Sequence, residues 1–168
     1  MRRASLLLIA LGVLSGCKEK EPDYVSPVAF DSAQAWIRTA KGDSVPLHVE
    51  LALSSAQHTF GLMARPSLDS MSGMVFVYPE DQPGENGFWM WRTRMPLDIA
   101  FMDSTGTILT MFRMEPCSTD MYADVCTRES AAYKPNVPYR SALEVNAGFF
   151  AKHGVEKGAT LAIGGGKD

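Results

Sequence analysis

Apolar and polar positions alternate with a period of two along several stretches of this chain, which is the pattern of half-buried β-strands. The clearest stretch is residues 45–53, where every odd position is Val or Leu. The pattern predicts eight strands, at residues 35–40, 45–53, 73–78, 88–93, 99–102, 108–114, 142–145 and within 155–163. Strands at such short spacing predict a mainly β (α+β) fold, a small single-domain and mostly antiparallel barrel or sandwich.

Two short helices are expected between these strands. Ser54, followed three residues later by Gln57, forms a capping-box pattern and predicts a helix over residues 55–63 that a following proline stops. Asn146 can cap a second helix over residues 147–153. Both helices are too short to form a layer of their own, so we expect them at the ends of the sheet.

The N-terminus has the parts of an export signal. Two arginines precede an uncharged apolar run at residues 4–13, and small residues follow. The run is too short to cross about 30 Å of hydrocarbon. Leu14-Ser15-Gly16-Cys17 resembles the bacterial lipobox, in which the cysteine takes a diacylglycerol and becomes the first residue. We therefore expect a signal over residues 1–16 and a lipid on Cys17; the alternative is an ordinary signal peptide with an incidental cysteine.

The rest of the chain divides into three parts. Residues 17–27 are charged and contain proline, which predicts a flexible tether. A single β-rich domain is expected over residues 28–163, and a flexible tail over residues 164–168. Lys18 follows the lipidated position, where Asp tends to retain lipoproteins at the inner membrane. We expect an exported protein that is lipid-anchored to the cell envelope, on the periplasmic face of the outer membrane.

Net charge limits the classes of binding partner that we expect, and the cysteine content predicts a disulfide. The 168-residue chain has a formal net charge of −3, which argues against nucleic acid. The expected partners are the membrane, through the lipid, and a small molecule or envelope component that the sequence does not identify. Cys117 and Cys126 are expected to form a disulfide in an oxidising compartment. A metal-binding pair and a reactive thiol are the alternatives.

Several blocks of sequence together resemble one known family. They are residues 61–65 (GLMAR), 73–77 (GMVFV), 88–93 (FWMWRT), 95–103 (MPLDIAFMD) and 142–148 (ALEVNAG). Their order and spacing are similar to those of the family called domain of unknown function 192. The resemblance implies a compact, β-rich, often exported domain without an established activity. Arg92 departs from the asparagine usual in that family, and Cys126 belongs to a longer insertion after the family's Pro116-Cys117.

Polar side chains inside apolar blocks are the candidates for chemistry. Asp98 and Glu144 each lie between apolar residues, and a carboxylate among core residues costs several kcal/mol unless it is paired. We expect one of them to meet Arg65, Arg94 or backbone N–H groups. A polar cleft of Arg65, Asp98 and Glu144, with Thr93, is one interpretation. A purely structural ion pair is another, and either carboxylate can also point outward.

An aromatic motif lies beside these residues. A period of two places Trp89 and Trp91 on one face and Met90 on the other. The two indoles could form a shelf that stacks a sugar or another flat ligand. Thioether binding of Cu(I) and simple core packing are the alternatives.

No sequence motif supports a defined enzyme. The chain lacks the signatures of serine hydrolases, zinc proteases, phosphate loops and thiol redox sites, and its three histidines share no ligand spacing. No cofactor or metal is expected. We interpret the chain as a ligand-binding or accessory module, with a hydrolase or lyase using Asp98 and Glu144, or a structural envelope protein, as alternatives. The candidate ligand-binding residues are Arg65, Trp89, Met90, Thr93, Asp98 and Glu144.

Overall fold

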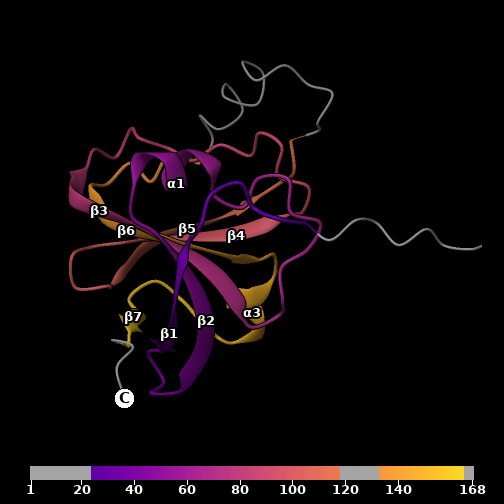
Figure 1. Cartoon of the computed structure of the whole chain (residues 1–168). Helices are drawn as coiled ribbons and strands as arrows, with labels where there is room; N and C mark the ends of the chain where they lie inside the picture. The colour runs from indigo at the N-terminus through magenta and orange to yellow at the C-terminus, as the bar shows by residue number, and fades with distance from the viewer. Residues whose placement is uncertain (1–23, 118–132, 165–168) are drawn as a thin grey trace, which may run out of the picture.

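One curled sheet of seven strands forms the body of the protein (Figure 1). The computed structural model describes residues 24–117 and 133–164. The strands are β1 (Asp31–Arg38), β2 (Ser44–Ala52), β3 (Ser72–Gln82), β4 (Leu97–Met102), β5 (Ile108–Met114), β6 (Tyr139–Asn146) and β7 (Thr160–Ile163), and the helices are α1 (Ser55–Phe60) and α3 (Phe149–Lys152). The spatial order is β5-β4-β6-β3-β2-β1-β7. The prediction of a small, mainly β domain with two short helices is confirmed.

The sheet is mixed, and it curls until its two edges touch at one end. Every paired neighbour is antiparallel except β2 and β3, which are parallel. Parallel neighbours need a crossover connection, and α1 with the residues after it supplies one. At the open edges Thr107 bridges Thr160, and the Ile108 N–H donates to the Ala159 carbonyl at 2.8 Å. These contacts make the sheet a half-barrel.

Helix α1 begins as the sequence predicts and ends earlier. The Ser54 side chain accepts from the Gln57 N–H, and the Gln57 side chain accepts from the Ser54 N–H, so the capping box is confirmed. The expected end at residue 63 is wrong, because Gly61 ends the helix at φ 49°. A Cβ at Gly61 would lie 3.2 Å from the Phe76 ring, so the chain can turn here only as glycine.

The expected strand at residues 88–93 does not form. In place of strand pairing, this segment has an isolated bridge from Trp91 to Cys117 and a hydrogen bond from the Ala64 N–H to the Arg92 carbonyl at 2.8 Å. Buried and exposed side chains do alternate along this segment, since Phe88 and Met90 are buried and Trp89 is 38% exposed. Arg92, however, takes a positive φ of 58°, and the Thr93 N–H donates back to the Met90 carbonyl, which ends the extended run. The apolar period here reflects a loop packed on the sheet and not strand pairing.

The second helix is also shorter than expected. Gly148 precedes α3 at φ 85° without a side-chain cap, so the prediction that Asn146 caps this helix is wrong. The Asn146 amide donates instead to the carbonyls of Leu68 and Asp69, at 3.0 Å each. A side chain at the end of β6 thus holds the loop before β3, a contact between residues far apart in sequence.

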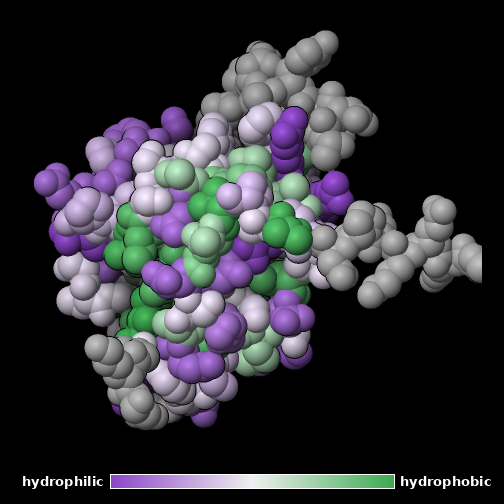
Figure 2. All heavy atoms as spheres, viewed as in Figure 1, coloured by the Kyte–Doolittle hydropathy of each residue, from purple (hydrophilic) through white to green (hydrophobic). Residues whose placement is uncertain are grey.

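Two hydrophobic clusters cover the two faces of the sheet. The first contains the α3 residues and these strand residues among others: Val49, Val75, Ala100, Leu143, Val145 and Leu161. The second contains the segment after α1, the segment at residues 88–90 and these strand residues among others: Met74, Phe76, Leu97, Ile99, Phe101 and Ala142. In the space-filling view, hydrophobic residues on the visible face form separate groups between hydrophilic ones (Figure 2).

Several sequence predictions concern residues outside those that the structure describes. The export signal, the lipid on Cys17 and residues 165–168 of the tail fall there, whereas Gly164, the first residue of the expected tail, donates its N–H to the Gln34 carbonyl at 2.8 Å. Cys126 does too, so its disulfide with Cys117 stays a prediction. No helix in the described part of the chain is long and apolar enough to cross a membrane.

Candidate functional site

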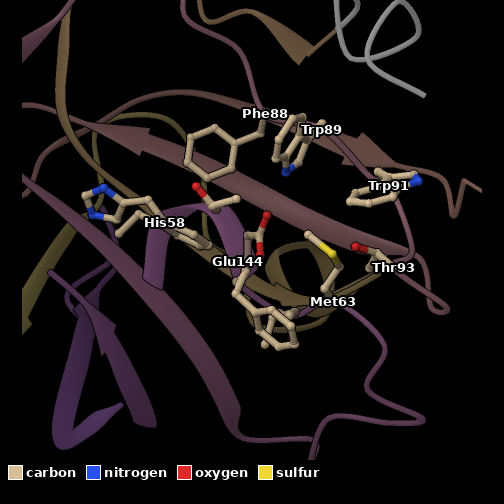
Figure 3. A pocket seen from close by; sticks show the side chains of 12 residues that line it. His58, Met63, Phe88, Trp89, Trp91, Thr93 and Glu144 are labelled. Carbon is tan, nitrogen blue, oxygen red and sulfur yellow. The ribbon is translucent and has the colours of Figure 1, made fainter. Parts of the chain in front are cut away.

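Glu144 is a buried carboxyl at the centre of the sheet. It lies on β6, opposite Met74 of β3 on one side and Ile99 of β4 on the other. The three residues share a face, because directly paired residues project to the same side of a sheet. Glu144 is 4% exposed, and its carboxyl points into a pocket on the face of the second cluster (Figure 3).

The pocket has a narrow inner part and a wider mouth. The inner part has a cavity volume of about 20 Å³, and its polar or aromatic walls are His58, Thr59, Phe60, Phe76, Phe88, Trp89, Trp91, Thr93 and Glu144. A cavity needs roughly 10–15 Å³ to hold one water molecule, so the inner part of the pocket has room for a single group of about that size. The adjoining outer hollow measures about 250 Å³ and shares four of its lining residues with the inner part: His58, Thr59, Phe88 and Trp89.

The Glu144 carboxyl is neutral at neutral pH. Burial raises its pKa to about 8, and the nearby positive charge of Arg65 opposes that rise only in part. Among the described residues, this carboxyl takes part in no hydrogen bond or ion pair, and it is open to the pocket that it lines. A protonated carboxyl offers one O–H donor and also accepts hydrogen bonds. The floor of the pocket therefore presents an uncharged donor and acceptor with no protein partner.

His58 belongs to the wall of the pocket. Its Nε2 lies 2.9 Å from the Ala52 carbonyl and 3.1 Å from the Val77 carbonyl. Both neighbours only accept, so Nε2 carries the hydrogen and is fully engaged. The ring centroid lies 4.5 Å from that of Tyr78, whose pKa burial raises far above its ordinary value. The imidazole and the phenol thus form one packed side of the outer hollow.

The aromatic rim lies on the loop at residues 88–93. The rings of Trp89 and Trp91 meet edge to face with centroids 6.4 Å apart, and the Arg92 guanidinium lies 4.6 Å from the Trp91 centroid. Trp89 is partly exposed, whereas Thr93 is 6% exposed. Figure 3 shows the Thr93 hydroxyl and the Glu144 carboxyl both directed into the pocket.

The structure brings together half of the candidate residues from the sequence. Trp89, Thr93 and Glu144 line one pocket. Met90 is 2% exposed and belongs to the second hydrophobic cluster. His58, which lines the same pocket, was not among the candidates, because helical residues far from the polar blocks carry no local signal of their role.

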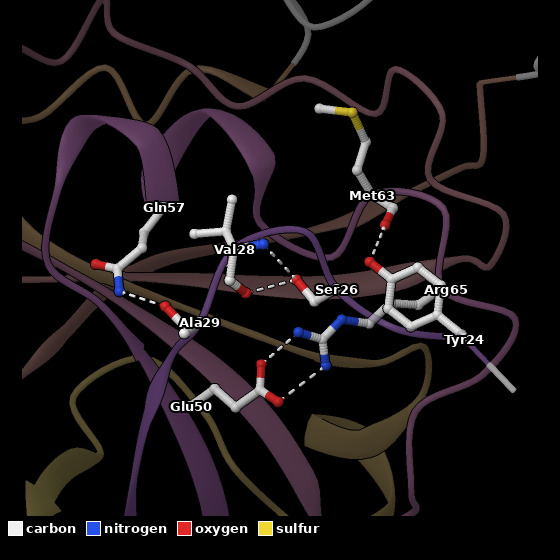
Figure 4. Close-up of polar contacts among 8 residues, drawn as sticks. All are labelled: Tyr24, Ser26, Val28, Ala29, Glu50, Gln57, Met63 and Arg65. Atoms are coloured by element: carbon white, nitrogen blue, oxygen red, sulfur yellow. Dashed lines mark hydrogen bonds and ion pairs between the residues drawn. The ribbon is translucent and has the colours of Figure 1, made fainter.

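Arg65 lies outside this pocket. Its guanidinium forms a two-contact ion pair with Glu50, and it stacks near the rings of Tyr24 and Phe30 at 5.9 and 5.7 Å from their centroids. Figure 4 shows Arg65 with Glu50 and Tyr24, and the Tyr24 hydroxyl also donates to the Met63 carbonyl at 3.1 Å. The charge of Arg65 is therefore already balanced.

Asp98 lies on the opposite face of the sheet from Glu144. Asp98 pairs with Val145, and Glu144 pairs with Ile99, the next residue on β4. Because neighbouring residues along a strand project to opposite faces, the two carboxylates lie on opposite sides of the sheet. Asp98 accepts from the Arg113 guanidinium and, at 2.7 Å, from the Gly148 N–H. The expected backbone N–H partner is thus present, while Arg113 was not foreseen. A cleft shared by Asp98 and Glu144 is ruled out by the register.

In the described part of the chain, no three His, Cys, Asp or Glu residues gather as a metal site. The inner pocket is lined by aromatic rings, the apolar side chains of Leu62 and Met63, the hydroxyls of Thr59 and Thr93, and the Glu144 carboxyl.

Comparison with known proteins gives relatives without an established activity. No curated protein matches this chain. A candidate transcription regulator from Sinorhizobium meliloti is 31% identical with a TM-score of 0.69, and the match covers 82% of this chain and 98% of that one. A protein of unknown function from Novosphingobium aromaticivorans is 25% identical with a TM-score of 0.61, over 83% of this chain and 91% of that one. The model of domain of unknown function 192, described as an uncharacterized ACR, matches residues 37–163, and the chain belongs to that family.

Proposed function

We propose that this protein is a lipid-anchored module of the cell envelope that binds a small, uncharged ligand in the pocket above Glu144. The observation that carries the proposal is the neutral Glu144 carboxyl, which is buried and has no partner among the described residues. The carboxyl is open to the pocket, so a ligand group that enters can reach it. A hydrogen bond of this kind contributes about 0.5–1.5 kcal/mol, which gives the pocket an affinity for hydrogen-bonding groups.

Binding fits this pocket better than acid–base catalysis. A hydrolase of the kind considered above needs two carboxyls that flank the scissile bond within one cleft, roughly 5–10 Å apart. Asp98 faces the other side of the sheet, and His58 uses its Nε2 hydrogen on two carbonyls. Among the described residues that line the inner pocket, Glu144 is thus left as a single carboxyl without a second acid or base of that type.

The lipid anchor would keep the pocket close to a membrane. Tyr24, seven residues after Cys17, is bonded to the Met63 carbonyl, and Met63 lines the inner pocket. Seven residues span at most about 25 Å when fully extended, so the pocket would lie within that reach of the anchored end.

DNA binding is not proposed for this chain. The Sinorhizobium protein is described as a transcription regulator, but a net charge of −3 opposes binding to DNA.

A fragment screen by NMR tests the binding proposal. The full-length chain, in a sugar-free detergent, is titrated with neutral, anionic and cationic fragments while the three indole N–H signals are followed. We expect neutral hydrogen-bonding fragments to shift Trp89 and to leave Trp36, which lies on β1, unchanged. Thr93→Val should weaken these shifts, and Thr160→Val on β7 is the matched control. A screen in which no fragment shifts Trp89 contradicts the proposal.

Mass spectrometry of the membrane fraction tests the anchor. The mature N-terminus should be a diacylated Cys17, and Cys17→Ala should release the protein from membranes. Recovery of an unmodified chain that begins at Met1 would refute this part of the proposal and leave the pocket unaffected.

A further inference from the structure

We propose that the ligand is a neutral, sugar-like ring that carries a hydroxymethyl arm, with the arm in the inner pocket and the ring in the outer hollow. This inference rests on the proposed function and names its ligand class. The arm meets Glu144 and Thr93, and the ring lies against Trp89.

The first argument is the shape of the pocket. An inner volume of about 20 Å³ admits one hydroxyl-sized group, whereas the outer hollow of about 250 Å³ is more than ten times larger. The two share a wall that includes Phe88 and Trp89, so one molecule can occupy both. A ligand of this shape has a narrow terminal group on a bulky body.

The second argument is the hydrogen-bonding chemistry of the floor. The protonated Glu144 carboxyl and the Thr93 hydroxyl each both donate and accept, and so does a ligand hydroxyl. A carboxylate arm would only accept, and its charge would be buried without a free cation, because Glu50 already pairs with Arg65. An ammonium arm would only donate, and it would have to draw the proton from Glu144. An alcohol satisfies both groups without creating a charge.

The third argument is the lining of the outer hollow. The aromatic residues Phe88 and Trp89 line this hollow together with the hydroxyl-bearing residues Thr59 and Tyr78. A pyranose has apolar C–H faces and hydroxyls around its edge, which match aromatic surfaces and a polar rim respectively. Trp89 is 38% exposed, so its indole is available to a ring that enters from solvent.

A matched set of methyl glycosides tests the inference on the full-length chain in a sugar-free detergent. The probes are methyl α-D-glucopyranoside, galactopyranoside and mannopyranoside, each with its 6-deoxy analogue, and in the gluco series also the 6-amino and 6-carboxylate analogues. Binding is read from the Trp89 indole N–H signal, with Trp36 as the internal reference. We expect at least one hydroxymethyl glycoside to bind saturably, about tenfold more tightly than its 6-deoxy analogue, since the analogue leaves buried polar groups unpaired.

Variants separate the contribution of each group. Glu144→Gln keeps a donor and an acceptor, so affinity should stay within about threefold of the parent chain. Glu144→Leu and Thr93→Val should each lose about tenfold. Thr160→Val is the matched control and should bind like the parent chain.

Three results would overturn the inference. One is that neutral fragments shift the Trp89 indole N–H signal while none of the glycosides does. This result would support the binding pocket and reject the sugar-like ligand class. Another is that each 6-deoxy analogue binds as tightly as its parent glycoside. The third is tighter binding of the amino or carboxylate analogue than of the alcohol. If neither fragments nor glycosides shift Trp89, the proposed function fails as well.

Discussion

Asp98 and Glu144 are buried to nearly the same degree, 6% and 4% exposed, on neighbouring strands of one sheet. Their surroundings differ completely. Asp98 has a guanidinium and a backbone N–H as partners, and it ties β4 to β5 and to the start of α3. Glu144 has no hydrogen-bonding partner among the described residues and faces a pocket. The comparison shows that burial alone does not distinguish the two carboxyls, and that the pocket beside Glu144 is what sets it apart from Asp98.

The largest expected effect concerns the pH dependence of stability. The pKa of Glu144 is raised from 4.5 to about 8 on folding, so between these values the folded chain holds a proton that the unfolded chain has released. This contribution to stability is fully present below pH 4.5 and is lost as the pH rises to about 8, by up to about 1.4 kcal/mol per pH unit. Glu144→Gln should remove it.

Urea unfolding at several pH values measures this effect. The parent chain and Glu144→Gln should be similarly stable near pH 4.5, and the variant should be the more stable one at pH 9. Glu156→Gln, at an exposed glutamate, is the control. Parallel pH profiles for the parent chain and Glu144→Gln would show that the Glu144 carboxyl is ionised in the folded protein.

The second prediction concerns the partnered carboxylate. Asp98→Ala should destabilise the fold by about 2–3 kcal/mol, because it leaves the Gly148 N–H without its acceptor and removes the charged partner of Arg113. Urea unfolding at pH 7 measures the loss. Ligand binding at Trp89 should remain in the variant that stays folded, since Asp98 faces the other side of the sheet. A loss of ligand binding without a loss of stability would contradict the assignment of Asp98 to a structural role.

The third prediction separates the rim of the pocket from the core. Trp89→Ala should abolish ligand binding, read in this variant from the indole N–H signal of Trp91, which also lines the inner pocket. It should lower stability by about 1 kcal/mol or less, since the Trp89 indole is partly exposed. Trp36→Ala, at a tryptophan exposed to a similar extent on β1, is the matched control and should keep binding. Thermal unfolding and the NMR titration are measured on the same samples.

The smallest expected effect concerns Arg65. Its charge lowers the pKa of Glu144 slightly against the effect of burial. The double variant Arg65→Met, Glu50→Gln removes the cation and its paired anion together, and the pKa of Glu144 should then rise further. A carboxyl ¹³C titration followed by NMR measures it. A fall in the pKa would mean that Glu50, and not Arg65, dominates the electrostatics at Glu144.

Local structure could be predicted where a few neighbouring residues decide it. Strand β5 was predicted with its observed bounds, Ile108–Met114, and the capping box of Ser54 and Gln57 formed as expected. The segment at residues 88–93 shows the limit of such reasoning. Its alternation correctly separated the buried from the exposed side chains, but an apolar loop lying on a sheet produces the same pattern as a strand, and pairing partners far along the chain decide which one forms.

The sequence by itself determined which residues are apolar at a period of two, where turns and one helix cap lie, and that Asp98 and Glu144 interrupt apolar segments. The tertiary structure alone decided that these two carboxylates face opposite ways. They stand 46 positions apart, and a shift of one residue in the pairing of β4 with β6 would place both on one side. That register depends on hydrogen bonds and packing across the whole sheet, which no local pattern of residues encodes.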